Sequence, residues 1–294
     1  MRTVKRGWGI AVLILAVLII SGIYLSGVNI PVLEPKGPIA DQEFRLMLLV
    51  VGIMLIVVVP VFALLTFIVW RYRDSAKKRG KYTPDWDHSR VIEGIWWLVP
   101  SILITILAVI TWNATYALNP YRPIASKNKP ITIEAMSLEW KWLFIYPKQG
   151  VASVNQVVFP KNTPVHFYLT SDAPMNSFWL PQLSGQIYTM PGMQTQLYLM
   201  ASNQGIYNGW SANISGIGFA SMMFKAVSTT RSGFNIWINQ IKKADPPLTL
   251  NRYNLLAKPS SYVPINYYSR PSKDLFYHTI SKYMAPPKPM MRVP

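Results

Sequence analysis

Three long apolar stretches dominate the first part of the chain, at residues 7–33, 46–70 and 94–121. Each reaches or exceeds the roughly 20 residues that a helix needs to cross the hydrocarbon core of a membrane. Core helices of a soluble protein are a poor alternative, because such helices rarely run this long without a charged or strongly polar face. The pattern therefore predicts a hairpin of two membrane helices, over about residues 44–70 and 91–117.

The first apolar stretch has two interpretations. A basic N-terminus followed by an apolar run is typical of a signal peptide. A small-x-small cleavage site is missing, however, because Leu25 stands two positions before Gly27 and Tyr24 stands two before Ser26. We therefore assign residues 1–28 to a signal peptide or a signal anchor, and we favour the retained anchor.

The pattern changes after residue 121, where Pro and Gly punctuate short runs of alternating apolar and polar residues. The runs "PITIEAMSLEW", "TPVHFYLTS" and "MQTQLYLMA" predict half-buried strands. Several such strands at short spacing favour a compact all-β sandwich or barrel over residues 122–230. Residues 231–294 then form a basic, aromatic-rich C-terminal extension, in which "FNIWINQIKK" and "KDLFYHTISKYM" are helix-like.

The basic residues predict the orientation in the membrane. Residues 71–90 carry seven Lys or Arg and three Asp, and the N-terminus adds Arg2, Lys5 and Arg6. The positive-inside rule places both segments in the cytoplasm. The transmembrane region, residues 29–121, then leads to an outer domain that we expect in the periplasm of a bacterium, with the chain crossing the inner membrane more than once.

Charge in the outer domain is strongly basic. From Arg122 onward we count 17 basic and 5 acidic residues, a net charge of +12. Nucleic acid is not the expected partner, because the domain faces away from the cytoplasm and carries no nucleic-acid motif. Plain solvation of the surface, or attraction to anionic lipid headgroups, is a better interpretation. So few carboxylates also suit work in an acidic medium, because little stability is then lost by protonating them.

Cysteine is absent from the chain. Disulfides, thiolate nucleophiles, iron–sulfur clusters and Cys-ligated zinc are therefore excluded. The three histidines, His88, His166 and His278, are far apart in sequence and are interpreted as surface or satisfied polar groups. The sequence also lacks nucleophile-elbow, Walker and zinc-protease motifs, so we expect no catalytic residue in this chain itself.

Residues 207–224, "YNGWSANISGIGFASMMF", have the spacing of a metal-binding loop, with Ser211, Ser215 and Phe219 where soft or imidazole ligands would stand. Two membrane helices followed by an exported β domain with this loop resemble subunit II of a haem–copper terminal oxidase, over about residues 30–285. The resemblance implies a cupredoxin-like Greek-key barrel. In the cytochrome c-oxidising members of that family, this barrel holds two copper ions through two Cys, two His, one Met and one Glu backbone carbonyl.

The family loop has the pattern Y-x-G-x-C-x-E-x-C-x-x-x-H-x-x-M, and a further His begins an H-S-x-x-x-P element. This element reads "NSFWLP" here. The matching positions are Tyr207, Gly209, Ser211, Asn213, Ser215, Phe219, Met222 and Asn176. Of the side-chain ligands only the methionine is kept, and a neutral hydroxyl cannot bridge two copper ions as a thiolate does. We expect no bound metal at these positions and no cofactor in this chain.

A chain of this family without the copper ligands resembles the quinol-oxidising branch, cytochrome bo-type ubiquinol oxidase. The resemblance implies that ubiquinol delivers electrons within the membrane, and that haem b, haem o and one copper are held by subunit I. It also implies smaller partner subunits III and IV and proton pumping driven by the reduction of O2. The basic outer domain agrees with this interpretation, because it would repel a basic cytochrome c.

Three further residues gain roles from the resemblance. Glu93, at the start of the third apolar stretch, matches a glutamate at the mouth of a proton channel into subunit I. Its alternative interpretation is a carboxylate stabilised by the helix N-terminus, worth about 0.3–1 kcal/mol. Trp140 and Trp142 match the family's aromatic segment, and we expect them to pack against subunit I.

One departure concerns lipidation. Many relatives of the quinol branch carry an L-x-G-C lipoprotein signal, whereas "LSGV" ends here in Val28, which cannot be acylated through a thioether. Two other functions stay open at this point. One is subunit II of a cytochrome c oxidase, and the other is a stand-alone membrane-anchored binding module with a cupredoxin-like domain.

Overall fold

The computed structural model describes residues 22, 30–72, 88–244 and 246–284. The chain divides into two compact units, residues 1–34 and 35–294. The described part of the first unit includes a short 3-10 helix, η1 (Pro31–Leu33), which begins at a proline. Almost all of the predicted signal segment 1–28, and most of the basic loop 71–90, lie outside the described residues.

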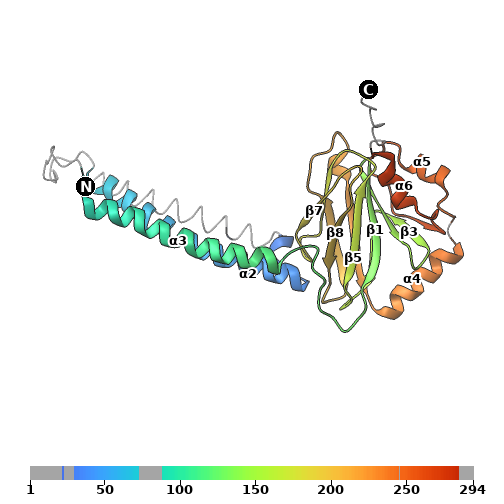
Figure 1. Cartoon of the computed structure of the whole chain (residues 1–294), viewed down its shortest axis with the longest axis horizontal. Helices are drawn as coiled ribbons and strands as arrows, with labels where there is room; N and C mark the ends of the chain where they lie inside the picture. The colour runs from blue at the N-terminus through green and yellow to red at the C-terminus, as the bar shows by residue number, and fades with distance from the viewer. Residues whose placement is uncertain (1–21, 23–29, 73–87, 245, 285–294) are drawn as a thin grey trace, which may run out of the picture. The chain divides into compact units, whose positions relative to one another are not determined.

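Two long helices open the second unit, α2 (Pro38–Arg71) and α3 (Arg90–Ala117). They lie side by side (Figure 1). Their most apolar windows have mean hydropathies of 3.2 and 2.1, and no residue in either window is buried within the chain. At 1.5 Å per residue the helices are about 51 and 42 Å long, enough to cross a hydrocarbon core. The two predicted helices are therefore confirmed as elements.

The start of α2 differs from the prediction. The helix begins at Pro38, six residues before the predicted start at residue 44. Proline suits the first helical position, because the N–H that it lacks would have no partner there. The first turn also carries Asp41, which is paired with Arg45 at 3.0 Å. Hydropathy marks only the apolar part of a helix, so it misses this polar first turn.

Eleven strands in the described residues form two sheets (Figure 1). The first sheet has the order β11-β3-β2-β1-β5-β8 and the second β4-β10-β9-β6-β7. The pairs β1/β5 and β4/β10 are parallel, and the other pairs are antiparallel. The strands are β1 (Ile131–Leu138), β2 (Lys141–Tyr146), β3 (Val151–Val154), β4 (Gln156–Pro160), β5 (Val165–Ser171), β6 (Asn176–Trp179), β7 (Gln186–Thr189), β8 (Thr195–Leu199), β9 (Gly205–Ser211), β10 (Met223–Thr229) and β11 (Asn266–Ser269).

The main core lies between the two sheets. Its centre is a group of aromatic rings in which Trp142 meets Phe178 edge to face at 5.3 Å and Phe178 stacks on Phe224 at 5.0 Å. Strand β1 shows why the sequence alternates, because Ile131, Ile133 and Ala135 face this core and the intervening residues do not. The domain is a β sandwich, as the alternating runs predict, and it has the cupredoxin-like fold that the resemblance implies.

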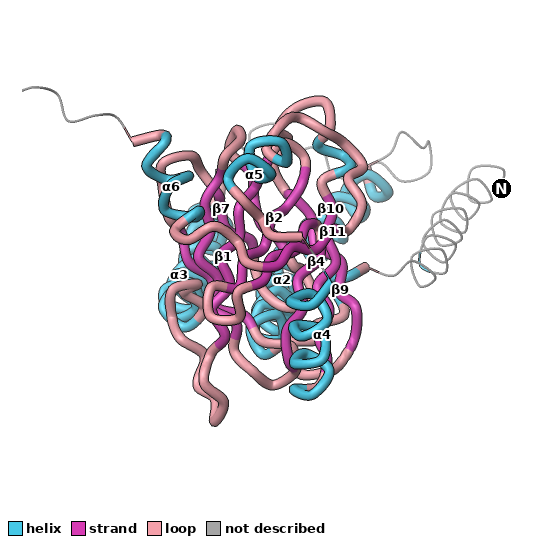
Figure 2. Tube along the Cα trace, turned by 90° about the vertical axis from the view of Figure 1, so that its right-hand side faces the viewer, coloured by secondary structure: helices cyan, strands magenta, loops and turns pink. Residues whose placement is uncertain are grey.

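The C-terminal extension adds a second core on the outer face of the first sheet. The elements of the extension are α4 (Arg231–Ala244), α5 (Leu250–Leu256), β11 and α6 (Leu275–Lys282), and Figure 2 shows them around the strands. The buried side chains of α4 belong to the main core, and those of α5 and α6 to the second. Residues of α5 and α6 pack with Met136 and Leu138 from β1, so the end of this strand is buried on both faces. The strand β11 pairs with β3 and covers an edge that would otherwise present unpaired backbone groups.

The chain that enters α2 is hydrogen-bonded to the outer domain. The Lys36 N–H donates to the Gln182 carbonyl at 2.7 Å, and the Lys36 carbonyl accepts from the Ser202 N–H at 2.9 Å. A Cβ on Gly37 would lie 2.4 Å from the Met200 carbonyl oxygen, so only glycine fits there. These contacts tie the start of the first spanning helix to two loops of the β domain.

Candidate functional site

Two residues at the degenerate copper-site positions contact each other. Ser211 ends β9 and Asn176 begins β6, and both are buried. The Ser211 hydroxyl donates to Asn176 Oδ1 at 2.9 Å. The Asn176 amide in turn donates to the Pro174 carbonyl at 2.8 Å. The polar groups at these two positions therefore satisfy each other and the backbone.

The loop that follows β9 is held by further backbone bonds. We call residues 212–222 the vestigial loop. Asn213 Nδ2 donates to the Met175 carbonyl at 2.9 Å, and the Ala212 N–H donates to the Ser177 carbonyl at 2.9 Å. The Ser211 N–H donates to the Met222 carbonyl at 3.2 Å, which closes the loop at its base. The structure thus joins Asn176, Ser211 and Asn213 in one region.

The other degenerate copper-site positions, Met222, Phe219 and Ser215, differ in their surroundings. Met222 is buried and belongs to the main core, so its thioether packs among apolar side chains. Phe219 begins the 3-10 helix η2 (Phe219–Ser221) and is half-buried. The Ser215 hydroxyl is buried without a hydrogen-bond partner in the described structure. Its surroundings supply neither a thiolate nor an imidazole.

These donors do not fit a copper centre. Two neutral hydroxyls, two amides and one buried thioether lack the anionic sulfur and imidazole nitrogen that stabilise copper. The described residues contain no group of three or more His, Asp or Glu side chains placed to hold a metal ion. The Ser211 hydroxyl is also already engaged with Asn176. We therefore derive no electron-transfer step through a metal in this chain.

Trp140 lies against the vestigial loop. It is the second residue of the two-residue turn between β1 and β2, and its φ of 62° is in the left-handed region, which a bulky residue rarely adopts. Its indole Nε1 donates to the Ser215 carbonyl at 3.3 Å. The ring also fills the space beside Gly216 and Gly218. The loop glycines therefore leave room for this half-buried tryptophan.

Trp142 corrects part of the sequence interpretation. Its side chain is 0% exposed and lies in the aromatic centre of the main core. A residue enclosed in this way cannot pack against a partner subunit. Trp142 lies within strand β2, which is buried along its length, whereas Trp140 lies in the turn before Lys141, where the strand begins. Packing against subunit I stays a prediction for Trp140 alone.

A buried carboxylate that the sequence did not mark joins the extension to the sandwich. Asp172, just after β5, accepts from Tyr253 at 2.6 Å, Lys282 at 2.7 Å and Tyr283 at 2.7 Å. Burial alone raises the pKa of Asp172, but these three hydrogen bonds outweigh it and hold the pKa below its ordinary value. We call this cluster the Asp172 clasp. A lone Asp in "TSDAP" gave no signal, because its partners are far away in sequence.

His166 is hydrogen-bonded within the sheet, as expected for a satisfied polar group. It lies on β5 with Nε2 2.9 Å from Gln196 Oε1 and Nδ1 3.0 Å from the Tyr198 hydroxyl. Its ring stacks on the Tyr198 ring at 4.0 Å. Burial lowers the pKa of His166, and the bond to Gln196 partly opposes this shift. It is a satisfied polar group on the sheet surface.

Glu93 lies in the first turn of α3 and is exposed. Its carboxylate accepts from the Ser89 N–H at 3.3 Å, while the Glu93 N–H donates to the Ser89 carbonyl at 2.9 Å. The second of these is the ordinary first backbone bond of the helix, and the first gives the Ser89 N–H, which the helix leaves free, an acceptor on the Glu93 side chain. The cap fixes the carboxylate at the helix end, where it remains open to solvent.

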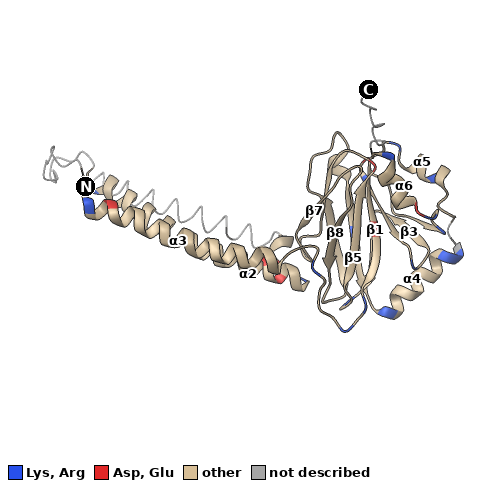
Figure 3. Ribbon diagram, in the orientation of Figure 1, with Lys and Arg blue, Asp and Glu red and all other residues tan. Residues whose placement is uncertain are grey.

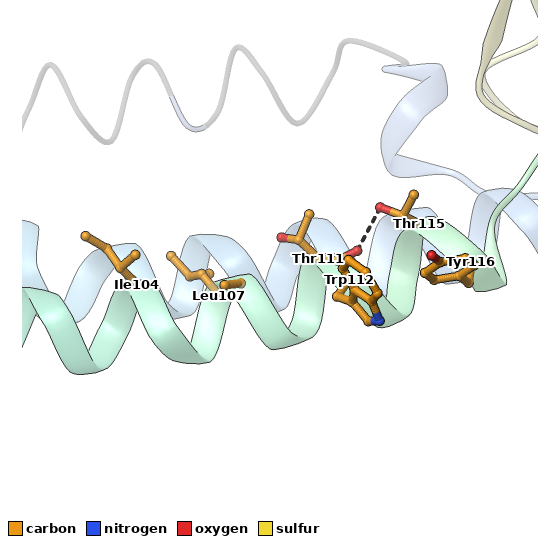
Figure 4. A pocket seen from close by; sticks show the side chains of 7 residues that line it. Ile104, Leu107, Thr111, Trp112, Thr115 and Tyr116 are labelled. Carbon is orange, nitrogen blue, oxygen red and sulfur yellow. Dashed lines mark hydrogen bonds between the residues drawn. The ribbon is translucent and has the colours of Figure 1, made fainter.

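A shallow hollow of about 460 Å³ runs along α3 (Figure 4). It is lined by Ile104, Leu107, Ala108, Thr111, Trp112, Thr115 and Tyr116. The Thr115 hydroxyl donates to the Thr111 carbonyl within the helix at 2.8 Å. Trp112 meets Tyr116 edge to face at 5.3 Å. The surface is mainly apolar, as expected for a helix that faces lipid or a neighbouring subunit.

Three family models match the chain. "Cytochrome C oxidase subunit II, transmembrane domain" matches residues 34–113, and "Cytochrome C oxidase subunit II, periplasmic domain" matches residues 147–229. "COX Aromatic Rich Motif" matches residues 242–287, which include α5, β11 and α6.

Several curated proteins are similar over most of the chain. Cytochrome bo(3) ubiquinol oxidase subunit 2 of Pseudomonas aeruginosa is 48% identical over 88% of this chain and 78% of its own length. Ubiquinol oxidase subunit 2 of Acetobacter aceti is 42% identical, with coverages of 90% and 86%. Quinol oxidase subunit 2 of Bacillus cereus is 36% identical, with coverages of 88% and 89%.

Proposed function

The chain belongs to the subunit II family of haem–copper oxidases, in the branch of the cytochrome bo-type ubiquinol oxidases, and from this premise we propose that it anchors and supplies protons to an oxidase whose redox centres lie in its partner. It is a membrane-anchored subunit of a ubiquinol oxidase, with its β domain outside the cytoplasm. Ubiquinol, a lipid-soluble donor, reaches the complex within the membrane.

The proposed route of the electrons rests on one observation. At the loop where copper-bearing relatives place their ligands, Ser211 is hydrogen-bonded to Asn176 and the methionine is in the core. Such neutral groups offer no stable place for an electron carrier. Electrons from quinol then enter haem b, haem o and one copper in subunit I, without passing through the outer domain. Subunits III and IV complete the proposed assembly.

Proton entry is the second part of the proposal. Glu93 is an exposed carboxylate at the end of a spanning helix, held in place by its bond to Ser89. A carboxylate at the edge of a membrane collects protons from the adjacent water and passes them to a buried chain of groups. With the N-terminus and loop 71–90 in the cytoplasm, this end of α3 faces the side from which a pump takes protons.

Trp140 supplies a contact with the partner. Its indole is half-buried against the vestigial loop, and the same loop carries two highly exposed isoleucines. Exposed apolar groups of this kind are typical of a protein–protein contact. We assign Trp140 and the surrounding surface to packing against subunit I, and we assign no electron transfer to the ring.

Gentle solubilisation of the complex tests the proposal. The purified chain should bring haem proteins with it, the haems should be reduced on addition of ubiquinol, and reduced cytochrome c should be a poor donor. Metal analysis of the same sample should account for all copper in subunit I. A chain that purifies alone, or stoichiometric redox-active copper bound to the outer domain, would contradict it.

A further inference from the structure

A short segment of the C-terminal extension touches the vestigial loop. We call residues 257–263, between α5 and β11, the brace. The Tyr262 N–H donates to the Ser221 hydroxyl at 3.3 Å. A Cβ on Gly218 would lie 2.5 Å from Ser261 Oγ and 2.2 Å from Trp140 Cδ2. The loop, the brace and the tryptophan therefore meet at a point that leaves no room for a side chain.

Both ends of the brace are fixed to the sandwich. Lys141, which is fully buried, donates through Nζ to the Leu256 carbonyl at 2.9 Å and the Lys258 carbonyl at 2.8 Å. Asn155 Nδ2 donates to the Val263 carbonyl at 2.8 Å, at the other end. A buried ammonium is costly unless hydrogen-bonded, and carbonyls at the C-terminal end of a helix lack internal partners. Lys141 satisfies both needs, so it holds the brace where it leaves α5.

The vestigial loop is bonded to the sandwich mainly at its base, through Ala212, Asn213 and Met222. Metal ligands would fix such a loop at several points, and none of the side chains described here can do so. The Ser221 hydroxyl, which receives the brace, also donates to the Gly218 carbonyl at 2.8 Å. The brace thus reaches the C-terminal end of the loop, next to Met222, and through the Ser221 hydroxyl it is linked to the turn at Gly218.

Loop and brace together expose a set of apolar side chains. Ile214 and Ile217 of the loop are 81% and 99% exposed, and Tyr262 of the brace is 84% exposed. Large side chains presented so fully mark a contact with another molecule. An apolar surface of a membrane-embedded subunit matches their chemistry, and this chain is one subunit of such a complex.

We propose that the brace takes the place of metal ligands, holding the vestigial loop and Trp140 in the shape that docks onto the membrane-embedded partner, with Lys141 as its positioning residue. The inference rests on the proposed function, because the partner is a subunit of the oxidase. It gives the aromatic-rich extension a role in assembly that goes beyond covering the sheet.

Two variants separate this role from general stability. Lys141→Met removes the two bonds to the Leu256 and Lys258 carbonyls, keeps a side chain of similar volume, and leaves the bonds of Ser221 in place. Ser221→Ala removes the contact between brace and loop together with the bond of the same hydroxyl to the Gly218 carbonyl. Their matched controls are Lys148→Met, an exposed lysine on a neighbouring turn, and Ser126→Ala, an exposed serine in the linker before β1. Each is introduced into the full complex, which is purified through a tag on this chain.

Three measurements follow on each complex: the haem retained through a detergent series, the rate of chymotrypsin cleavage in the vestigial loop, and the melting midpoint of the β domain. Both variants should lose haem at lower detergent and be cleaved about tenfold faster, since the loop opens locally. Ser221→Ala should keep the melting midpoint of its control. General instability would instead lower the midpoint without selective loop cleavage.

Unchanged haem retention and loop cleavage in Ser221→Ala and in folded Lys141→Met would overturn the brace. The wild-type complex keeps this outcome distinct from failure of the proposed function. If wild type retains haem and is reduced by ubiquinol, only the brace has failed. If wild type carries no haem protein, the proposed function has failed, and the brace then fails with it for lack of a partner.

Discussion

At the scale of single residues, the hydroxyl of Ser211 and the amide of Asn176, both poor copper ligands, decide the chemistry. A thiolate and an imidazole can share a metal ion, whereas a hydroxyl and an amide preferentially bond to each other, as they do here at 2.9 Å. The pair keeps a buried polar site satisfied without any ion. The outer domain has only five Asp or Glu residues, so each buried carboxylate has a large share in the dependence of its stability on pH.

Replacing Glu93 with Gln tests proton entry. The amide oxygen can still accept from the Ser89 N–H, so the helix cap persists, but the group no longer carries a proton. Quinol oxidation should slow by about tenfold, within the range of a lost proton-transfer group, with normal haem content. Asp41→Asn, in the first turn of the other spanning helix, is the matched control. Equal turnover of the two variants would remove Glu93 from the proton path.

Glu134 should make the β domain more stable as the pH falls from about 7 to 4.5. Burial, and second the charge of Asp274, raise the pKa of Glu134 from 4.5 to about 7. The folded state then binds the proton more tightly than the unfolded state does, so acidification through this window favours folding. One pKa unit corresponds to about 1.4 kcal/mol, and because Glu134 is partly exposed we expect on the order of 1–2 kcal/mol.

The measurement is the denaturation midpoint of the full chain between pH 8 and pH 4.5. Glu134→Gln should raise the midpoint at pH 8 and flatten its dependence on pH, about as far as the wild type gains on acidification. Asp172 acts in the opposite sense at lower pH, since a lowered pKa gives stability that is lost on protonation. A wild-type midpoint that falls steeply from pH 7 to pH 5 would contradict the assignment to Glu134.

At the scale of elements, the C-terminal extension is part of the β domain. Strand β11 covers an edge of the first sheet, and α5 and α6 turn its outer face into a second core. The Asp172 clasp joins the helices to the end of β5. Replacing Asp172 with an uncharged residue would leave Tyr253, Lys282 and Tyr283 without their charged acceptor. The stability of the clasp should therefore be sensitive to this single substitution.

Asp172→Asn should loosen α6 without unfolding the sandwich. It removes the ion pair with Lys282 at 2.7 Å and weakens the bonds from two tyrosines. A buried charge pair broken on one side costs about 3–5 kcal/mol, and since Lys282 is half exposed we expect about 2 kcal/mol. Hydrogen exchange should rise in α5 and α6 before it rises in β1. Lys148→Gln, at an exposed position in the turn between β2 and β3, is the control, and equal exchange in both variants would contradict the clasp.

At the scale of the whole molecule, charge and anchoring act together. The basic residues lie mostly on loops and helix ends, including Lys242 and Lys243 in the last turn of α4 (Figure 3). Cations in the last turn of a helix interact favourably with the negative end of its dipole. The start of α2 is also hydrogen-bonded to the loops at Gln182 and Ser202, so the outer domain is joined to its anchor by more than a covalent linker.

Single cysteines test the topology, since the chain has none of its own. A thiol at Ser75→Cys, in the basic loop 71–90, should react with a membrane-impermeant maleimide only from the cytoplasmic side. A thiol at Ser126→Cys, in the outer domain, should react only from the other side. We expect the basic loop to face the cytoplasm, because positively charged segments tend to be retained there. Labelling of Ser75→Cys in intact spheroplasts would reverse the proposed orientation.

The sequence by itself determined the elements and the chemistry that is missing. Apolar length gave α2 and α3, alternation gave β1, β5 and β8, and the residues at the loop positions showed that copper ligands are lacking. These are local properties of a chain, because helix length, strand period and ligand type can each be counted along it. The substitution pattern at Ser211, Ser215 and Phe219 was therefore visible without coordinates.

Only the tertiary structure decided which residues meet. Trp142 looked like a contact residue and lies in the core, while Asp172 and Lys141 looked ordinary and hold the extension in place. Lys141 and Leu256, or Asp172 and Lys282, are more than a hundred residues apart. Burial and partnership at such separations depend on how the sheets and the extension pack, and a pattern read along one strand or helix contains no record of the element that covers it.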